Sequence, residues 1–473
     1  MKLVLRYHDV LHCAGVTFTK TNGKSKMTLL KCLKMLLIVL FWVPPICATH
    51  WPQFRGPHSN QLSQDKQLPQ VWSQDKNVQW QVKIPGRAWS SPVVWGDKIF
   101  VTTAVLDEPS KSPTDSPAQA SSRPPVPDRI QPNADYRWEI YCLDKNSGKI
   151  LWTKVATQGK PTMVTHSQNS YASETPVTDG ERVYAYFGMK SLYCYDFQGN
   201  LLWEKDLGVY KMNKDWGTGS SPLIHDGLVY LQIDNEEQSF LVALEGKTGD
   251  ERWRISRQEG SNWCTPIIWQ NHQRTELVTG GKTVRAYDPL SGALWWELNV
   301  GGGRSVASPT ADRERLYFGT EKRSDGGGFL FAVKAGATGD ITPKAGESTS
   351  SGVLWSQSNA GIAFASPLVY RDLVYILERS HGGINCYHTQ TGESVYSERL
   401  PGVRTFWASP WACDGKIFCL DDRGTTHIVQ AGHEFKILGL NKLDDDFYAS
   451  SAITGDSLIF RGADSLYCIR ESH

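Results

Sequence analysis

The segment Pro222-Leu-Ile-His-Asp-Gly-Leu-Val-Tyr-Leu231 carries the pattern from which the architecture can be worked out. Two short apolar runs flank Asp226-Gly227, and this arrangement predicts a β-hairpin, because a two-residue hairpin turn needs positive φ angles that Asp and Gly accept readily. Short strands joined by tight turns also suit a chain of 473 residues that holds 18 Trp, 18 Tyr, 42 Gly and 24 Pro.

The hairpin belongs to a pattern that occurs eight times, which predicts a repeat architecture. Each copy has a small residue, then Ser or Thr followed by Pro, then two apolar residues, a turn and a strand. The prolines are Pro92, Pro176, Pro222, Pro266, Pro309, Pro367 and Pro410. We assign the eighth copy to Ser450-Ser451-Ala452, with Ala in place of Pro. Five of the seven spacings lie between 42 and 46 residues.

The second half of each repeat is an eleven-residue motif, seen first as Cys142-Leu-Asp-Lys-Asn-Ser-Gly-Lys-Ile-Leu-Trp152. Copies of the same length end at Trp253 and Trp296 and keep Gly at the seventh place. The Gly is expected to adopt the left-handed conformation in a second turn, and the Trp to cover the edge of its strand. Each repeat therefore supplies about four short strands, as a propeller blade does.

The two ends of the repeat array complement each other. The last copy stops at Cys468-Ile-Arg470 without a Trp strand, whereas Asn77-Val-Gln-Trp80 matches the strand that ends at Trp152. We expect the Trp80 segment to form the outer strand of the last blade, which removes an exposed sheet edge. The sequence thus predicts an all-β, eight-bladed propeller of four-stranded blades, closed by an N-terminal strand and forming one domain over residues 49–470.

The eleven-residue motif ending in Trp resembles the tryptophan-docking motif of the PQQ-like (pyrroloquinoline-quinone) β-propeller repeat family. Trp51-Pro-Gln-Phe-Arg-Gly-Pro57 is similar to the beginning of many exported members. The family includes quinoprotein dehydrogenases and the propeller lipoprotein of the outer-membrane protein assembly machine. The resemblance implies the fold for nearly the whole chain beyond residue 48, and it says little about function.

Two segments fall outside the repeats. Residues 1–48 are interpreted as an N-terminal extension and a signal peptide, with the apolar run Met35–Val43 behind Lys31 and Lys34, and cleavage after Ala48. Translation is expected to start at Met27, and the product to be exported to the periplasm or the extracellular space. A Pro- and Ser-rich insertion at 107–135 is expected to be a disordered loop.

Charge and cysteine usage narrow the functional classes. Lys plus Arg is 50 and Asp plus Glu is 49, so a globally basic nucleic-acid binder is excluded. No zinc-like spacing of Cys and His occurs, so no metal site is predicted. The resemblance implies that the family's enzymes stack a quinone between a Trp and a disulfide of adjacent cysteines, and hold Ca²⁺ with Glu, Asn and Asp. This sequence has no adjacent Cys pair and no Cys-x-x-Cys-His haem motif, so no cofactor is predicted, with PQQ and calcium as the alternative.

Candidate ligand-binding residues lie just ahead of the Ser/Thr-Pro steps, at the predicted channel mouth. They are Arg87, Trp89, His166, Asn169, Tyr171, Glu174, Trp216, Asn262, Trp263, Arg304, Phe364, Arg404, Trp407 and Tyr448. Aromatic side chains with arginines are suited to a sugar, a quinone or an anionic peptide. The opposing interpretation is that these aromatics fill the channel as core.

No catalytic residues are predicted, because the common nucleophile, phosphate-loop and metalloprotease motifs are absent from the sequence. The leading functional hypothesis is an exported, non-catalytic propeller that binds a protein partner or a small ligand at the channel face. The alternatives are a quinone-dependent dehydrogenase or another enzyme acting in the channel, and a scaffold for outer-membrane protein assembly. The sequence leaves the oligomeric state open.

Overall fold

The structure is a computed structural model that describes residues 50–63, 68–107, 130–304, 306–321, 327–360 and 362–471. All of its strands lie in one compact unit, Cys47–His473. The predicted signal peptide, the Met27 start and most of the Pro- and Ser-rich insertion lie outside the described residues. The ends of that insertion connect Leu106 to Tyr136, which are paired residues of one hairpin.

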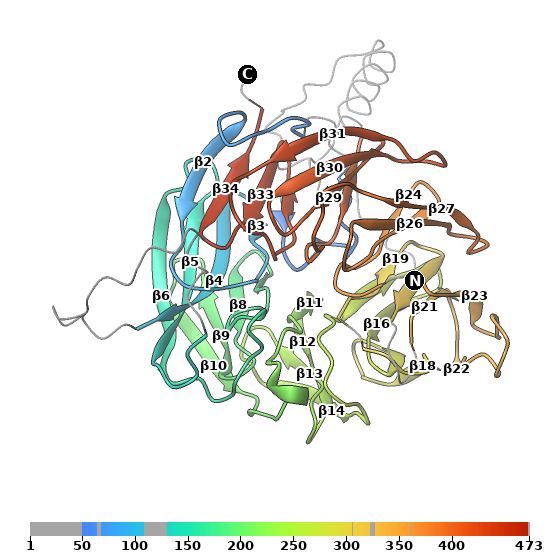
Figure 1. The fold of residues 1–473 in the computed structure, drawn as a ribbon. Helices are drawn as coiled ribbons and strands as arrows, with labels where there is room; N and C mark the ends of the chain where they lie inside the picture. The colour runs from blue at the N-terminus through green and yellow to red at the C-terminus, as the bar shows by residue number, and fades with distance from the viewer. Residues whose placement is uncertain are drawn as a thin grey trace, which may run out of the picture. The chain divides into compact units, whose positions relative to one another are not determined.

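Eight antiparallel sheets form the propeller, as the sequence predicted (Figure 1). Blades 1 and 2 consist of β3 (Val93–Trp95), β4 (Lys98–Leu106), β5 (Tyr136–Asp144) and β6 (Ile150–Gly159), then β7 (Val177–Thr178), β8 (Arg182–Tyr186), β9 (Ser191–Asp196) and β10 (Leu201–Asp206). Blades 3 and 4 consist of β11 (Leu223–His225), β12 (Leu228–Ile233), β13 (Phe240–Glu245) and β14 (Glu251–Ser256), then β15 (Ile267–Gln270), β16 (Thr275–Thr279), β17 (Thr283–Tyr287) and β18 (Leu294–Asn299).

The second half of the chain repeats this arrangement. Blades 5 and 6 consist of β19 (Thr310–Ala311), β20 (Arg315–Gly319), β21 (Phe329–Lys334) and β23 (Val353–Ser358), then β24 (Leu368–Tyr370), β25 (Leu373–Leu377), β26 (Gly383–His388) and β27 (Ser394–Arg399). Blades 7 and 8 consist of β28 (Trp411–Cys413), β29 (Lys416–Leu420), β30 (Thr425–Gln430) and β31 (Ile437–Lys442), then β32 (Ala452–Thr454), β33 (Ser457–Arg461), β34 (Ser465–Ile469) and β2 (Val78–Lys83).

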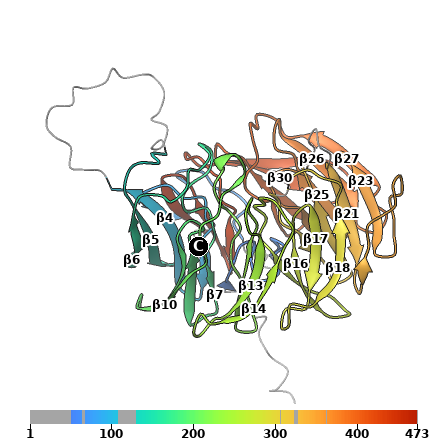
Figure 2. The same cartoon turned by 90° about the horizontal axis from the view of Figure 1, so that it is seen from below.

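Three short elements complete the description. β1 (His50–Trp51) pairs with β3 on the inner side of blade 1, and β22 (Gly339–Asp340) pairs in parallel with β18 at the outer edge of blade 4. The 3-10 turn η1 (Asn213–Asp215) is the single helical element of the described residues. Figure 2, turned by 90°, shows neighbouring sheets standing side by side.

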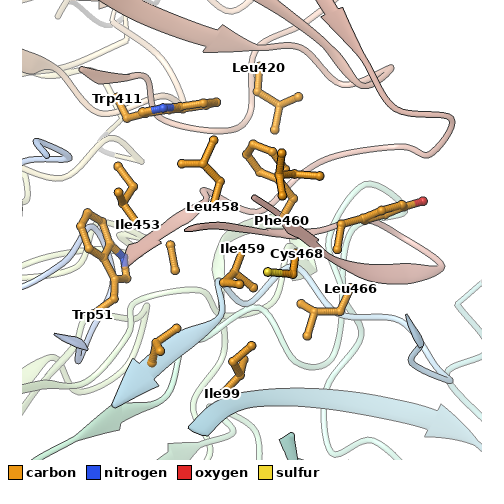
Figure 3. Close-up of a cluster of buried hydrophobic side chains, with 14 of the residues drawn as sticks. Trp51, Ile99, Trp411, Leu420, Ile453, Leu458, Ile459, Phe460, Leu466 and Cys468 are labelled. Atoms are coloured by element: carbon orange, nitrogen blue, oxygen red, sulfur yellow. The ribbon is translucent and has the colours of Figure 1, made fainter. Parts of the chain in front are cut away.

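The predicted closure between the two ends of the array is confirmed. β2 pairs antiparallel with β34, and Trp80 lies opposite Cys468. In Figure 1 the blue β2 lies beside the red β34. A buried cluster spans the junction and joins Ile99 of blade 1, Trp411 of blade 7 and Ile459 of blade 8 (Figure 3). The last blade is therefore completed by a strand that precedes the first.

The eighth copy of the repeat differs by one residue from the assignment made on the sequence. β32 begins at Ala452, as β28 begins at Trp411 directly after Pro410. Ser451 therefore occupies the place of the proline, and Ala452 is the first strand residue. The error arose because Ser450-Ser451 offers two registers for one Ser, and only the strand pairing decides between them.

The motif tryptophans fasten five of the eight blades to the next one. Trp80 of blade 8 donates its indole N–H to the carbonyl oxygen of Lys145 in blade 1 at 2.9 Å. Gly148, with φ of 72°, lies under the same indole, and a Cβ at this glycine would come within 2.7 Å of the ring. Trp152, Trp203, Trp253 and Trp355 meet Gly199, Gly249, Gly292 and Gly392 in the same way. The seventh residue of the motif is therefore Gly for two reasons, its backbone conformation and the neighbouring indole.

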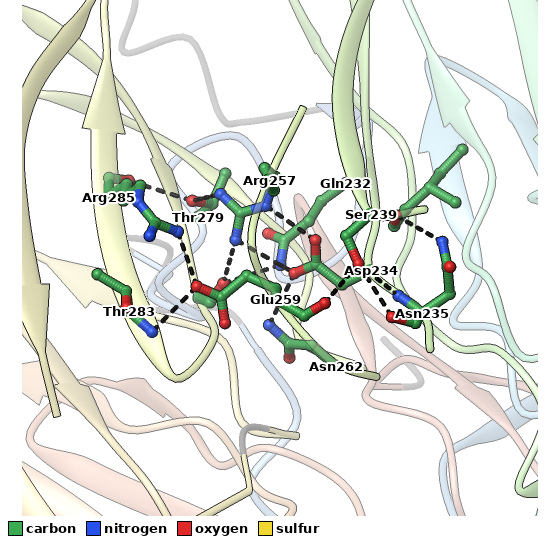
Figure 4. Close-up of polar contacts among 12 residues, drawn as sticks. Gln232, Asp234, Asn235, Ser239, Arg257, Glu259, Asn262, Thr279, Thr283 and Arg285 are labelled. Carbon is green, nitrogen blue, oxygen red and sulfur yellow. Dashed lines mark hydrogen bonds and ion pairs between the residues drawn. The ribbon is translucent and has the colours of Figure 1, made fainter. Parts of the chain in front are cut away.

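A buried polar network adds to the fastening between blades 3 and 4 (Figure 4). Arg257 forms an ion pair with Asp234 at 2.8 Å, and both side chains are fully buried. The same guanidinium donates to Thr279 Oγ1 at 2.7 Å and to the Gly280 carbonyl at 2.9 Å, which belong to blade 4. The buried guanidinium is therefore paired with a carboxylate, and its other hydrogen bonds go to oxygen acceptors.

The docking geometry predicts unequal costs for two glycine substitutions. Gly148→Ala places a methyl group against the Trp80 indole, whereas a Cβ added at Gly227, with φ of 78°, would meet nothing within 4 Å. Gly227→Ala should cost about 1 kcal/mol of unfolding free energy from backbone strain alone. Gly148→Ala should cost at least about 2 kcal/mol more, since a packed indole has to move. Urea unfolding measures both, and equal costs would contradict the docking role of Gly148.

Candidate functional site

The segments that lead into the eight innermost strands build a cavity at the centre of the propeller. A residue before proline is restricted to extended backbone, so side chains alternate along each segment. The residue directly before the proline is buried, and the residue three before it is half-buried, in every copy. These two positions, called here the inner and the outer ring position, line a cavity with a volume of about 490 Å³, with the exception of the inner residue of blade 6, Ser366.

Hydrogen bonds join the inner ring positions into a chain that runs around the axis from blade 1 to blade 8. In seven of the eight copies the backbone N–H of the inner ring residue donates to the side-chain hydroxyl of the equivalent residue in the next blade, at 2.9–3.0 Å. The seven bonds run from Ser91 through Thr175, Ser221, Thr265, Ser308, Ser366 and Ser409 to Ser450. Backbone N–H groups that would otherwise be buried without a partner are satisfied in this way. The bond from Ser409 to Ser450 also supports the corrected register of the eighth copy.

The outer ring position carries aromatic side chains in five blades and small ones in three. Its members are Trp89, Ser173, Gly219, Trp263, Val306, Phe364, Trp407 and Tyr448. The sequence grouped Trp89, Trp263, Phe364 and Trp407 at this place, and the corrected register adds Tyr448. The aromatic wall is continuous over blades 6, 7, 8 and 1, and the wall of blades 2 and 3 is formed by Ser173 and Gly219.

The aromatic rings of the wall cover one another's faces. Trp89 and Tyr448 stack with centroids 3.9 Å apart, and Phe364 and Trp407 stack at 4.3 Å with planes only 5° apart. Arg87 lies over the Trp89 ring at 4.9 Å. Trp407 and Tyr448, at the middle of the wall, are tilted by 48° with their centroids 5.7 Å apart. The wall therefore consists of two stacked pairs, and in each pair one face of each ring is covered by its partner.

An N-terminal strap, residues 50–62, forms the floor of the cavity. Arg55 is fully buried and donates to the carbonyl oxygens of Pro309 at 2.8 Å and Pro367 at 2.7 Å, and also to the Thr310 hydroxyl. Phe54, its neighbour, lines the cavity. Burial lowers the pKa of Arg55 to about 9, and its hydrogen-bond partners are neutral oxygens.

The strap contacts the inner strands of seven blades. In blades 2 and 3, Thr178 donates its N–H to the Pro52 carbonyl at 2.9 Å, and Ile224 donates its N–H to Gln53 Oε1 at 3.5 Å. Further contacts are Asn60 with Val369, Gln61 with Ala412 and Ser451, and β1 with β3. A segment fixed to so many blades closes this end, so the cavity opens at the opposite end only, which we call the mouth.

The mouth carries two arginines and one glutamate. Arg304 and Glu321 form an ion pair, and Arg379 Nη1 lies 3.6 Å from Glu321 Oε1. Arg304 also lies over the Trp216 ring at 4.7 Å, and Arg379 over the Phe364 ring at 4.6 Å. Across the opening, burial and the charges of Arg379 and Arg304 lower the pKa of His166. The mouth is therefore positively charged.

Nine of the fourteen residues selected from the sequence line this cavity. They are Trp89, His166, Asn169, Trp216, Trp263, Arg304, Phe364, Trp407 and Tyr448. The segment rule used on the sequence thus brings most of the candidates together, and the wall is open at its centre rather than packed solid.

The other five lie elsewhere. Arg87 stacks on the outer side of the wall, and Arg404 forms an ion pair with Asp422. Tyr171 is buried against Tyr136 in the core of blade 1 and blade 2. Asn262 donates to Asp234 in the network of Figure 4. These four side chains do not line the cavity.

Glu174, the fifth, occupies an unusual place. The position two before the proline holds Ser90, Ser220, Cys264, Ala307, Ala365, Ala408 and Ala449 in the other seven copies. Glu174 is 2% exposed, and burial raises its pKa to about 7, against the lowering effect of hydrogen bonds from the Thr218 hydroxyl and backbone N–H groups. Thr218 lines the cavity, so the carboxyl group lies directly behind the wall.

Several cavity residues were not selected by the rule applied to the sequence. Glu321 and Arg379 occupy equivalent places in blades 5 and 6, each two residues after the second strand, β20 and β25, whereas the rule considered only residues ahead of the proline. Ser173, Gly219 and Val306 occupy the outer ring position, and counting three residues back from every proline would have found them. Phe54 and Arg55 belong to the segment Trp51–Pro57, which indicated a family resemblance but no binding site.

Metal-binding clusters and membrane-spanning helices are both missing from the described residues. Within that part of the chain, no group of three or more His, Cys, Asp or Glu side chains is arranged to hold a metal ion. The same residues contain no helix with the length and apolar character required to cross a membrane. The seven described cysteines are buried and form no disulfide with one another.

The chain matches one family model and is similar in fold to several solved structures. Residues 136–398 match the family model described as outer membrane protein assembly factor BamB. BamB from Moraxella catarrhalis is similar in fold, with a TM-score of 0.52 and 12% identity, over 82% of this chain and 98% of that one. Quinohemoprotein alcohol dehydrogenase from Comamonas testosteroni gives a TM-score of 0.57 and 10% identity, over 90% of this chain and 81% of that one.

One curated relative was also found. Tetrathionate hydrolase from Acidithiobacillus ferrooxidans is 22% identical over 232 residues, which is 43% of this chain. The match spans 42% of the length of that relative. The three names refer to proteins with different functions.

The position of Glu174 predicts a pH-dependent stability. Its folded pKa of about 7 lies above the ordinary value of 4.5, so the native state holds the proton more tightly and loses stability as pH rises from about 4.5 to about 7. Glu174→Gln stays neutral, so its unfolding free energy relative to the parent should increase by about 2–3 kcal/mol between pH 5 and pH 8. Glu181→Gln, at a side chain 76% exposed, controls for the lost charge. Parallel stability profiles for Glu174→Gln and the parent would contradict a buried carboxyl that titrates.

Proposed function

Since the chain belongs to the PQQ-like β-propeller family, whose matching model is described as outer membrane protein assembly factor BamB, we propose that it is a non-catalytic module that binds a small ligand in its central cavity. Family membership fixes the propeller and leaves function open, since members of such a fold differ in what they do. The proposal therefore depends on the cavity itself.

The observation that carries the proposal is a cavity closed at one end by the strap. Its volume of about 490 Å³ falls in the range of roughly 300–1,000 Å³ that is usual for small-molecule sites. Aromatic side chains, hydroxyl groups and arginines line it together, which combines an apolar wall with a few polar groups. A channel that served only as core would be filled by these side chains.

A stacked quinone is not part of this proposal. Stacking needs an accessible aromatic face. Trp89 is stacked with Tyr448 and has Arg87 over its ring, and Phe364 is stacked with Trp407 and has Arg379 over its ring. Two adjacent cysteines, which the resemblance implies on the opposite side of the quinone, are absent from the sequence. The residues present therefore do not fit a calcium-bound quinone.

Catalysis in the same cavity is the second candidate, and Glu174 favours it. A carboxyl group with a pKa of about 7 suits a general acid or base at neutral pH, and the Thr218 hydroxyl lies between it and the cavity. The similarity to tetrathionate hydrolase suggests hydrolysis of a sulfur oxyanion as the reaction to try.

This second candidate has a direct assay. Release of thiosulfate from tetrathionate by the parent, with at least a tenfold loss in Glu174→Gln and no loss in Glu181→Gln, would support an enzyme. No release at any pH between 4 and 8 would remove it and leave the binding module.

Export to the periplasm or extracellular space, and a protein partner at the channel face, remain part of the proposal. The similarity in fold to BamB is consistent with a partner protein, and a role in outer-membrane protein assembly is the corresponding alternative. Cell fractionation separates these possibilities, because an assembly scaffold should be recovered with the outer membrane.

The binding function is tested by closing the cavity. Ligand-observed NMR with glucose, benzyl alcohol, benzoate and thiosulfate should show binding of at least one probe to the parent protein. Val306→Trp and Ser173→Phe each place a large side chain at the outer ring position and should abolish that signal. Leu290→Trp, at a residue 64% exposed, is the matched control and should keep it. Probe binding that survives both cavity variants, with folding confirmed by circular dichroism, would contradict the proposed function.

A further inference from the structure

The distribution of charge around the cavity indicates which ligands it accepts. At the mouth, two guanidinium groups, Arg304 and Arg379, share one carboxylate, Glu321. Below the inner ring, the Arg55 guanidinium is fully buried and is bonded to two carbonyl oxygens and a hydroxyl. An electropositive cavity surrounded by low-dielectric protein strengthens its attraction for anions.

The aromatic wall adds to this positive character. An aromatic ring has a negative face and a positive edge. In the two stacked pairs of the wall one face of each ring is covered by its partner, and the guanidinium groups of Arg87 and Arg379 lie over the rings of Trp89 and Phe364. The positive edges of such rings attract a negatively charged oxygen, as the guanidinium groups beside them do.

The inner ring contributes hydroxyl donors. Seven of its hydroxyl oxygens each accept a backbone N–H, and an oxygen that accepts still has its own proton to donate. In the described parts of the chain, no hydrogen bond is seen in which one of these hydroxyls donates to a protein acceptor. Ser91 differs from the other members because its hydroxyl accepts none of the seven bonds, and it lines the cavity.

We propose that the cavity binds a compact oxyanion with at least two negatively charged oxygen groups, held between the hydroxyls of the inner ring and Arg379 and Arg304 at the mouth. The inference rests on the proposed function and names the class of ligand for that same site. Carboxylates and sulfur or phosphorus oxyanions share this chemistry, since each presents several acceptors to many donors.

The test compares probes that have one shape and different charges. Isothermal titration at low salt with terephthalate, benzoate, terephthalamide and benzamidine should rank the dianion first, the monoanion at least tenfold weaker, and the neutral and cationic probes weaker still. Binding of terephthalate should weaken steeply between 20 and 300 mM salt. Thiosulfate and inorganic phosphate form a second arm, which tells an organic from an inorganic oxyanion.

Variants assign the binding to the named groups. Arg379→Gln removes one guanidinium from the mouth and should weaken terephthalate binding about tenfold. The matched control is Arg252→Gln, which changes an exposed arginine of β14 that pairs with Glu245. This variant should leave terephthalate binding unchanged. Ser91→Ala removes a hydroxyl from the lining without removing any bond of the ring, and should weaken binding about threefold.

The two proposals fail in different ways. If terephthalamide binds as tightly as terephthalate and both are lost in Val306→Trp, the cavity binds ligands but the oxyanion inference is overturned. If Arg379→Gln and Arg252→Gln behave alike, the inference is likewise overturned. If no probe binds in a manner that Val306→Trp abolishes, the proposed function is overturned as well.

Discussion

Seven hydrogen bonds between neighbouring inner ring residues hold the centre of the propeller together. Each bond joins a backbone N–H in one blade to a hydroxyl in the next, so all eight innermost segments lie at the same height. The inner strand begins directly after the next residue, which is proline in seven blades and Ser451 in the last, and each proline keeps the residue before it extended. Extended backbone then turns the outer ring residues toward the axis and the residues between them toward the blade contacts.

Two further sets of contacts give the cavity a single opening. The tryptophan and glycine pairs fasten the outer halves of neighbouring blades, and Trp80 with Gly148 does so across the two ends of the array. The strap fastens the inner strands from below and places Phe54 and Arg55 at the floor. Without the strap the cavity would be a channel open at both ends, in which a small ligand is less enclosed.

Function is expected where equivalent positions of the repeat stop being equivalent. The outer ring position is aromatic in four adjacent blades and small in blades 2 and 3, so the cavity has two unlike sides. Glu174 occupies a position that holds a small residue in the other seven copies. Burial of an ionised carboxyl group costs free energy, and the raised pKa of Glu174 reflects that cost. Both departures concern blade 2, and this makes its side of the cavity the most specialised part.

The eight blades, their closure through Trp80 and Cys468, and nine of the cavity residues follow from the amino-acid sequence, because hairpin turns, prolines and docking motifs act within one repeat and recur at regular spacing. The strap could not be recognised as a floor, since Arg55 meets Pro309 across 254 residues that share no pattern with it. The folded chain alone shows that aromatic rings of the wall stack in pairs, that Arg379 reaches the mouth and that Tyr171, Asn262 and Arg404 do not line the cavity. These properties depend on side-chain directions and on contacts between blades, which no single repeat encodes.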